Sequence, residues 1–267
     1  MSKIGLLAGN GAFPIEVAAA AKARGIAVVA VAHREETSPE IAAFCDRVSW
    51  IEVGWLETAI RTFKEAGVKV AAMAGGISRA RLRGAFSPDA RALAMLSRIG
   101  KFSDDAVLRA VAAELEADGI EVIDPVEWFG LALAEAGLLA GPRIAADSLD
   151  DIRLGFAVAR ALGAFDVGQV VAVRNGVVVA VEAIEGTDAT LKRAAALSGP
   201  GLVVAKTSKP GQDLRFDRPA IGPRTIDLLH EIRAAVLAVE AQKTLIIEPA
   251  RTLRMARELE LSVYGYS

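Results

Sequence analysis

The chain has few of the side chains that build disulfides and histidine or thiolate metal sites. Its 267 residues include one cysteine, Cys45, and two histidines, His33 and His230. A single cysteine excludes an intrachain disulfide and fits a reducing compartment. One thiol and two imidazole groups are too few to build a metal site that consists mainly of histidine and cysteine ligands. A bound metal ion would therefore need oxygen ligands.

Long apolar runs and a strong charge of one sign are also missing. No stretch gives the roughly 18 uninterrupted apolar residues that indicate a membrane-spanning helix, although 53% of the residues are hydrophobic and a large core is expected. The first residues lack the longer apolar region and cleavage site of a signal peptide, so a cytoplasmic protein is expected. The net charge of −2 indicates no nucleic-acid partner.

Segments with strand and helix character alternate in the first half of the chain. Strands are expected at 3–8, 27–32, 48–53, 70–74 and 120–123, and helices at 14–24, 56–66, 89–97, 104–117 and from 126. This alternation predicts an α/β fold in which helices cover a parallel sheet, here a Rossmann-like N-terminal nucleotide-binding domain over residues 1–138.

The second half has a different pattern, which predicts a C-terminal mixed α/β domain over residues 147–267. The Gly-, Ala- and Pro-rich stretch 137–147 is interpreted as the linker. Asn175-Gly176 between two apolar runs predicts an antiparallel hairpin. The other expected elements are helices at 149–162, 187–197, 226–241 and from 249, and strands at 202–205, 245–247 and 262–264.

A glycine-rich loop near the start of the chain is the first candidate site. In "LLAGNGAFP" an apolar run ends at Gly9, Gly11 follows, and Pro14 opens a helix. Backbone N–H groups in such a loop bind anions, so Gly9, Asn10, Gly11 and Ala12 are candidate ligand contacts. Pro14 stands where a dinucleotide fold needs its third glycine, and no acidic residue is cleanly placed to bind a ribose. A tight turn without a ligand is the alternative.

Two further stretches of the first half offer polar groups. In "AGGISR" at 74–79, Gly76 and Arg79 follow the fourth strand, so they are expected at the same edge of the sheet as the first loop. Arg79 would reach a phosphate, or it is an ordinary surface arginine. In "KFSDDAV" at 101–107, Asp104 and Asp105 begin a helix, for which capping is the simpler explanation.

The second half has a higher density of charged side chains. "VEAIEGTDATL" at 181–191 places Glu182 on a strand, where a carboxylate needs a partner or a ligand, and then Thr187 and Asp188 at a helix start. "KTSKPGQDLRFDRPAIGPRT" at 206–225 mixes acids and bases in one loop. If 213–217 is extended, its acidic and basic side chains share one face, which suits a metal-bridged phosphate. A salt-bridged surface loop is the alternative.

These stretches together resemble the LpxI family, the UDP-2,3-diacylglucosamine pyrophosphatases of lipid A biosynthesis. The motifs that carry the resemblance are "GLLAGNGAFP", "AGGISR", "DVGQVVAVRNGVVVAVEAIEGTDATL" and "KPGQDLRFDRPAIGPRT". The resemblance covers nearly the whole chain. One departure lies at 101–105, where the family often has Lys-Gly-Asp-Asp, and it weakens any role for that segment. The chain also lacks the histidine set and the R-E-x-x-E-E helix of other diphosphate hydrolases.

The resemblance implies a two-domain cytoplasmic enzyme with its site in the cleft between the domains. The implied reaction is Mg²⁺-dependent hydrolysis of UDP-2,3-diacylglucosamine to UMP and 2,3-diacylglucosamine 1-phosphate (lipid X). Mn²⁺ is the alternative metal. The partner is therefore a small-molecule lipid, and peripheral contact with the inner membrane face and homo-oligomer formation are left open. The family's essential aspartate, in its R-x-D-x-P segment, corresponds to Asp217.

The predicted site combines these assignments. The candidate catalytic residues are Asp217, Asp213, Glu182 and Lys209, with Asp217 also the metal ligand. The candidate substrate- and nucleotide-binding residues are Gly9, Asn10, Gly11, Ala12, Gly76, Arg79, Thr187, Asp188, Lys206 and Gln212. Two other hypotheses remain open: a nicotinamide-dependent oxidoreductase, which the first glycine loop alone favours, and a non-catalytic nucleotide-sugar sensor.

Overall fold

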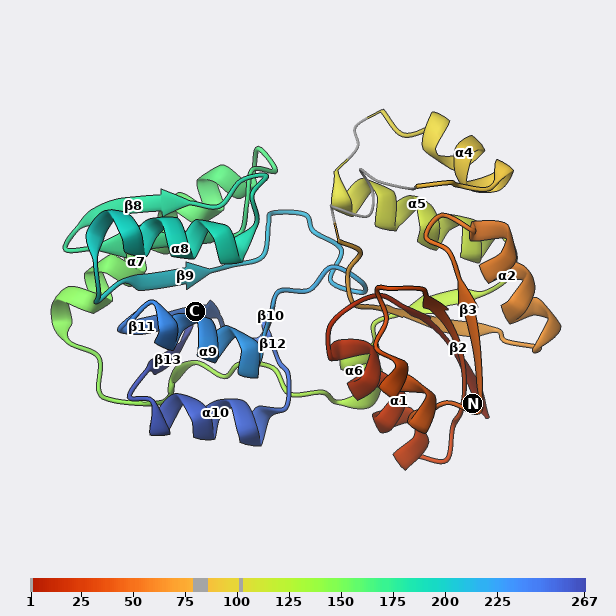
Figure 1. The fold of residues 1–267 in the computed structure, drawn as a ribbon, viewed down its shortest axis with the longest axis horizontal. Helices are drawn as coiled ribbons and strands as arrows, with labels where there is room; N and C mark the ends of the chain where they lie inside the picture. The colour runs from red at the N-terminus through yellow and green to blue at the C-terminus, as the bar shows by residue number, and fades with distance from the viewer. Residues whose placement is uncertain (1, 79–85, 101–102) are drawn as a thin grey trace. The chain divides into compact units, whose positions relative to one another are not determined.

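A computed structural model of the protein describes residues 2–78, 86–100 and 103–267, which form two compact units (Figure 1). Unit 1 comprises Met1–Leu131 and Asp213–Asp217, and unit 2 comprises Ala132–Gln212 and Arg218–Ser267. Unit 1 has a parallel sheet and unit 2 a mixed one, so the predicted α/β fold class is confirmed. None of the described helices is long and apolar enough to cross a membrane.

Unit 1 is built on a five-stranded parallel sheet in the order β3-β2-β1-β4-β5. Its strands are β1 (Lys3–Ala8), β2 (Ala27–His33), β3 (Arg47–Ile51), β4 (Val70–Ala74) and β5 (Glu121–Ile123). Its helices are α1 (Phe13–Ala23), η1 (Pro39–Phe44), α2 (Leu56–Glu65), α4 (Ala90–Ser97), α5 (Asp104–Ala117) and α6 (Pro125–Phe129).

Both faces of this sheet are covered, and the alternation of side chains along each strand explains why. On β2, Val28 and Ala30 pack with α1, whereas Val29 and Val31 pack with α2 and the helices next to it. Successive side chains of a strand point to opposite faces, so a strand between two helix layers is apolar throughout. In Figure 1, α1 and α6 lie on one side of this sheet, and α2, α4 and α5 lie on the other.

Unit 2 is built on a six-stranded mixed sheet in the order β6-β13-β11-β9-β7-β8 and a short parallel pair, β10-β12. Its strands are β6 (Gly137–Ala140), β7 (Val170–Arg174), β8 (Val177–Val181), β9 (Val203–Lys206), β10 (Ala220–Ile221), β11 (Val236–Glu240), β12 (Leu245–Ile246) and β13 (Ser262–Tyr266). Its helices are α7 (Ala146–Gly163), α8 (Thr187–Ser198), α9 (Pro223–Glu231) and α10 (Pro249–Glu258). The predicted hairpin is confirmed, because β7 and β8 pair antiparallel around Asn175 and Gly176.

Two expectations for the second half were wrong. The stretch predicted as a helix over 226–241 contains α9 and then strand β11, because Arg233 has a left-handed backbone (φ 53°) and breaks the helix. β11 pairs in parallel with β9 and β13, and a buried parallel strand has the continuous apolar sequence that also suits a buried helix. The presumed linker contains β6, which pairs with β13 more than 120 residues away, a contact that local sequence does not reveal.

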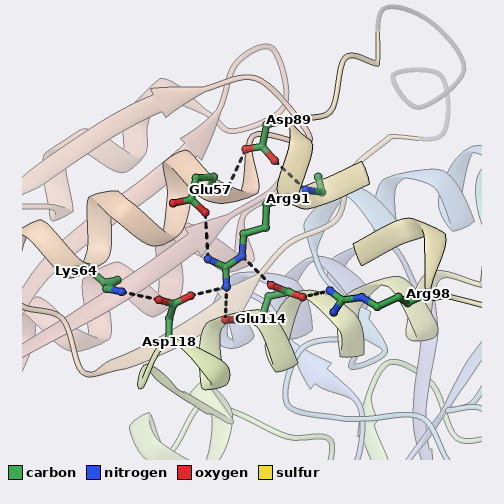
Figure 2. Close-up of polar contacts among 8 residues, drawn as sticks. Glu57, Lys64, Asp89, Arg91, Arg98, Glu114 and Asp118 are labelled. Carbon is green, nitrogen blue, oxygen red and sulfur yellow. Dashed lines mark hydrogen bonds and ion pairs between the residues drawn. The ribbon is translucent and has the colours of Figure 1, made fainter. Parts of the chain in front are cut away.

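Arg91 on α4 connects three helices of unit 1 (Figure 2). Its guanidinium lies 2.7 Å from a carboxylate oxygen of Glu114 on α5 and 3.1 Å from one of Glu57 on α2, and it also donates to Asp118. Its hydrogen bonds hold the pKa of Glu114 below its usual value, and Lys64 together with Arg91 lowers the pKa of Asp118. This stabilisation is present at neutral pH and is lost as the pH falls through the folded-state pKa values.

We expect Arg91→Met to lower the free energy of unfolding of unit 1 by about 2 kcal/mol at pH 7, because charge-assisted hydrogen bonds to part-buried carboxylates are lost. The difference should shrink below about pH 4, where the wild-type carboxylates also take up protons. All three tryptophans, Trp50, Trp55 and Trp128, lie in unit 1, so urea unfolding followed by tryptophan fluorescence reports on it.

The matched control is Arg98→Met, which removes another cation beside Glu114. The Arg98 side chain is 67% exposed, whereas that of Arg91 is 23% exposed. An exposed ion pair contributes about 0–1 kcal/mol, so the control should change stability little. An equal decrease in the free energy of unfolding in the two variants would contradict a special role for Arg91.

Candidate functional site

The unit 1 sheet changes direction of winding between β1 and β4. The two strands are neighbours, yet the segment after β1 leads to α1 on one face and the segment after β4 leads to α4 on the other. In open parallel sheets, ligands bind in the crevice beyond the carboxyl ends of two such strands. The two predicted glycine loops follow these strands, so the fold places both at this switch point.

The glycine loops are joined by backbone hydrogen bonds. The N–H of Gly9 donates to Ala74 at 2.8 Å, and the N–H of Asn10 donates to the carbonyl of Gly76 at 2.7 Å. A Cβ atom on Gly9 would lie 2.2 Å from the Gly76 carbonyl oxygen, and one on Gly75 would lie 2.3 Å from that of Asn10. Gly9 and Gly75 therefore serve the contact between the loops.

Gly11 differs from these two glycines. Its φ is +84°, in the region that favours glycine, and a Cβ atom there would meet no heavy atom of the described residues within 4 Å. Ala12 then precedes α1 without a side-chain cap on the helix N-terminus. Within the described part of the chain, packing does not require Gly11 to be small, so its backbone N–H is a candidate ligand contact at this edge.

A carboxylate that the sequence analysis did not single out links the two loops. Glu36, beyond β2, accepts hydrogen bonds from the Asn10 side chain at 2.7 Å and from the N–H and hydroxyl of Ser78 at 3.0 and 2.5 Å. His33 and Thr37 both donate to the carbonyl of Ala8. Burial lowers the pKa of His33, so the ring is neutral at pH 7. Its Nδ1 carries the proton, because this nitrogen faces the carbonyl oxygen of Ala8.

The turn Asp213–Asp217 packs in unit 1 although both flanking segments belong to unit 2. It is not extended as expected, because the N–H of Asp217 returns to the carbonyl of Asp213 at 3.1 Å. Phe216 is 6% exposed and lies in the core between the sheet and helices α2, α4 and α5. An extended strand would have aligned three charged side chains, whereas the turn buries one aromatic ring and leaves Asp217 half-buried.

Two polar networks hold this turn. Arg215 donates to the Asp213 carboxylate at 2.9 Å, to Glu116 at 2.9 Å and to the Val122 carbonyl at 3.2 Å. The Asp213 N–H donates to the Asp105 carboxylate at 3.0 Å. Burial alone would raise the pKa of Asp213, but the hydrogen bonds and charge of Arg215 outweigh it and lower this pKa.

Asp105 also indicates where the turn lies in unit 1. α5 leads directly into β5, which runs parallel to β4, so α5 must begin at the carboxyl edge of the sheet. Asp105 lies in the first turn of α5 and binds Asp213. The turn that carries Asp217 therefore lies at the sheet edge where the glycine loops also lie.

Unit 2 holds the remaining described candidates in two groups. The Glu182 carboxylate accepts hydrogen bonds from the Thr187 hydroxyl at 2.8 Å and the Gln169 N–H at 3.1 Å, so it has the partners that its position demands. Asp188 pairs with Arg224 at 2.8 Å. A cavity of about 160 Å³ beside them has walls that include Leu191, Leu228 and Leu237 and a polar side that includes Thr187, Lys206 and Arg224.

The second group is the loop after β9. Lys209 Nζ lies 2.6 Å from Asp166, and the Lys209 N–H donates to the Gln212 side-chain carbonyl at 2.8 Å. That bond fixes the orientation of the Gln212 amide, whose buried nitrogen has no hydrogen-bond partner among the described residues. Lys206 Nζ donates to the Ala220 carbonyl at 2.8 Å.

Glu240, at the end of β11, anchors this loop and was missed because its segment was predicted to be helical. It accepts hydrogen bonds from the hydroxyls of Thr207 and Ser208 at 2.8 and 2.6 Å and from the Ser208 N–H at 2.9 Å. Burial raises the pKa of Glu240, but these bonds and one from Lys243 outweigh it and lower the value to about 2. Glu240 is therefore ionised throughout the physiological range.

The structure thus assigns the predicted residues to two groups. Unit 1 holds Gly9, Asn10, Gly11, Ala12, Gly76, Asp213 and Asp217. Unit 2 holds Glu182, Thr187, Asp188, Lys206, Lys209 and Gln212. Arg79 lies outside the described residues. Across the described ranges, no three acidic, histidine or cysteine side chains are grouped as a metal site would require.

Comparisons with known proteins match the whole chain. The model of the LpxI N-terminal domain matches residues 3–130, and that of the LpxI C-terminal domain matches residues 135–264. The UDP-2,3-diacylglucosamine pyrophosphatase LpxI of Caulobacter vibrioides is 35% identical over 278 residues, which cover 99% of this chain and 98% of that protein.

Solved structures give only remote similarity. The biotin carboxylase subunit of pyruvate carboxylase is 15% identical with a TM-score of 0.30, over 64% of this chain and 35% of that one. Phosphoribosylglycinamide synthetase from Anaerococcus prevotii is 10% identical with a TM-score of 0.27, over 76% and 44%. The chain thus spans less than half the length of either protein. The two consecutive domain models and the Caulobacter relative show that the chain belongs to the LpxI family.

Proposed function

We propose that the chain hydrolyses the diphosphate of UDP-2,3-diacylglucosamine to UMP and 2,3-diacylglucosamine 1-phosphate in lipid A biosynthesis. The observation that carries the proposal is the match over 99% of the chain to a relative named for this substrate and this bond cleavage. The geometry supports it, because two glycine loops and an aspartate-bearing turn share the carboxyl edge of one parallel sheet.

In this proposal the glycine loops hold the uridine nucleotide. Gly11 and the N-terminus of α1 offer backbone N–H groups to a phosphate, and the field of the helix favours a negative charge there. Glu36 keeps the two loops together through Asn10 and Ser78. That role leaves its carboxylate occupied, which argues against the ribose-binding acid of an NAD site.

The chemical step is attack of water on one phosphorus of the diphosphate. The bond from that phosphorus to the bridging oxygen breaks, and the oxygen leaves on the other phosphate. Asp217 acts as the base that takes the proton from the attacking water, as a ligand of a metal ion, or as both. Asp213 is a poorer base, because Arg215 already neutralises it and lowers its pKa.

A divalent cation fits this oxygen-rich edge. Mg²⁺ is usually held by one or two carboxylates together with substrate phosphates and water, so Asp217 and the diphosphate would suffice without a three-carboxylate cluster. Mn²⁺ accepts the same donors. When bound, the ion would stabilise the negative charge that develops on the phosphate oxygens.

The cavity of unit 2 is the candidate site for part of an acyl chain. Its volume of about 160 Å³ is smaller than the roughly 300–1,000 Å³ usual for whole-ligand pockets. Leucine side chains form its walls, while Lys206 brings positive charge that suits the phosphate of a lipid product, and Arg224 on the same side is paired with Asp188. Because such a substrate resides in a membrane, we also propose peripheral contact with the inner membrane face.

The direct assay is incubation of the protein with UDP-2,3-diacylglucosamine and Mg²⁺, followed by mass spectrometry for UMP and the sugar 1-phosphate. We expect both products in equal amounts. Binding without turnover would indicate a nucleotide-sugar sensor. Binding of NAD(P)H without UMP formation would instead indicate an oxidoreductase.

Asp217→Asn should lower kcat by roughly 10²-fold or more, the usual cost of losing one positioned acid–base or electrostatic group. UMP affinity should be retained, because the proposed nucleotide contacts are in the glycine loops. The control is Asp227→Asn on the exposed side of α9, which removes the same charge without touching the site. Near wild-type turnover of Asp217→Asn would refute the assignment.

Gly11→Val should weaken UMP binding at least tenfold, measured by calorimetry, because a side chain would occupy the space proposed for the phosphate. Gly25→Val is the matched control: Gly25 also has a positive φ (+68°) and open space, but it lies in the turn between α1 and β2, at the opposite sheet edge. Both variants carry a backbone strain of about 1–3 kcal/mol. Equal UMP affinity in the two variants would show that the loop is only a turn.

Removal of divalent cations with EDTA should abolish UMP release, and Mg²⁺ or Mn²⁺ should restore it. The reason is that the Asp217 carboxylate and the diphosphate are both negatively charged, so a cation is needed to balance the charge that develops in the transition state. Full turnover in metal-free buffer would contradict the proposed cofactor.

A further inference from the structure

The Arg215 side chain joins the turn that carries Asp217 to two different elements of unit 1. It donates to Glu116 near the end of α5 at 2.9 Å and to the carbonyl of Val122 in β5 at 3.2 Å. It also donates to the Asp213 carboxylate, from Nε to both oxygens at 3.1 and 3.2 Å and from a terminal nitrogen at 2.9 Å. One guanidinium therefore binds the turn, a helix and a strand together.

Two neighbouring contacts make the same connection. Phe216 is 6% exposed and its ring packs in the unit 1 core, so burial of this apolar side chain also holds the turn on unit 1. At the other end, the N–H of Asp213 is bound by Asp105 in the first turn of α5. The guanidinium of Arg215 also lies 5.5 Å from the centre of the Phe216 ring, which adds a cation–π contact.

These contacts surround the residue on which the proposed function depends. Arg215 is two positions before Asp217, and the N–H of Asp217 is bound by the carbonyl of Asp213, whose side chain Arg215 holds. A shift of the turn would therefore move the Asp217 backbone directly.

We propose that Arg215 is a positioning residue that holds Asp217 on unit 1, which also carries the two glycine loops. The inference rests on the proposed function. Arg215 then affects the rate of the chemical step through the position of Asp217, and it contributes little to substrate affinity. A displacement of about 1 Å at a reacting group can cost roughly 10²-fold in rate, which sets the scale of the effect.

The test compares Arg215→Met and Arg215→Lys with the wild type, using kcat, KM and UMP affinity. We expect kcat to fall about 10- to 100-fold in Arg215→Met, with KM and the UMP Kd within about threefold of wild type. Arg215→Lys should recover little of the lost kcat, because a single ammonium group cannot bind Asp213, Glu116 and Val122 together as the planar guanidinium does. Full activity of either variant would overturn the inference.

Glu116→Gln is the milder variant, in case Arg215→Met fails to fold. The Glu116 side chain is 44% exposed, and the change removes one charged partner of Arg215 while the other contacts of the turn remain. We expect a few-fold loss of kcat with tryptophan fluorescence unchanged. Arg251→Met is the matched control, because Arg251 makes a single exposed ion pair, with Glu248 on the same helix end. An equal effect in Arg251→Met would overturn the inference.

Hydrogen exchange separates positioning from a general loss of stability. In Arg215→Met, exchange should rise in the peptide that covers 213–217 and stay unchanged in β1 and β4. A rise throughout unit 1 would assign Arg215 a structural role only. Failure of the proposed function is distinguishable, because the wild type would then release no UMP from UDP-2,3-diacylglucosamine. Failure of the Asp217 assignment alone would appear as normal turnover of Asp217→Asn, whatever Arg215→Met does.

Discussion

The candidate site at the carboxyl edge of the unit 1 sheet depends on docking of the Asp213–Asp217 turn on that unit. Burial of the Phe216 ring is worth roughly 1.5–3 kcal/mol, and Arg215 adds charge-assisted hydrogen bonds to a helix and a strand. A few residues from the second half of the sequence thereby become part of the first unit. Because of this exchange, Asp217 lies at one sheet edge with two glycine loops that precede it by about 200 and about 140 residues in the sequence.

The two units supply different chemistry. Unit 1 offers backbone N–H groups at a switch point and one half-buried aspartate, which suits a nucleotide and its diphosphate. Unit 2 offers a leucine-walled cavity with Lys206 and Arg224 on its polar side, and a loop whose backbone and hydroxyl groups donate hydrogen bonds to Glu240. The Caulobacter relative is named for UDP-2,3-diacylglucosamine, a substrate that contains both a nucleotide and acyl groups.

Much of this arrangement follows from local sequence, and the parts that do not follow depend on distant contacts. Alternation of apolar segments predicts the α/β class, and Asn175-Gly176 predicts its hairpin, because each signal is local. β6 and β11 were misassigned, because a short edge strand and a buried parallel strand are defined by their neighbours. The roles of Glu36 and Glu240 could not be predicted either, since each depends on loops that only the fold brings to the carboxylate. For the same reason the segment 213–217, predicted as an extended strand, proved to be a turn docked on unit 1.

Hydrogen exchange of the backbone amides of 213–217 in the free wild-type protein shows whether this turn is folded as part of unit 1. If the turn belongs to unit 1, the N–H groups of Phe216 and Asp217 exchange slowly. In the Arg91→Met variant, whose mutation lies in unit 1, their protection should then fall together with that of β4 and β5, while β9 and β11 in unit 2 keep theirs. Exchange at the rate of an unstructured peptide in the wild type, or protection that follows β9 and β11 instead, would contradict the account.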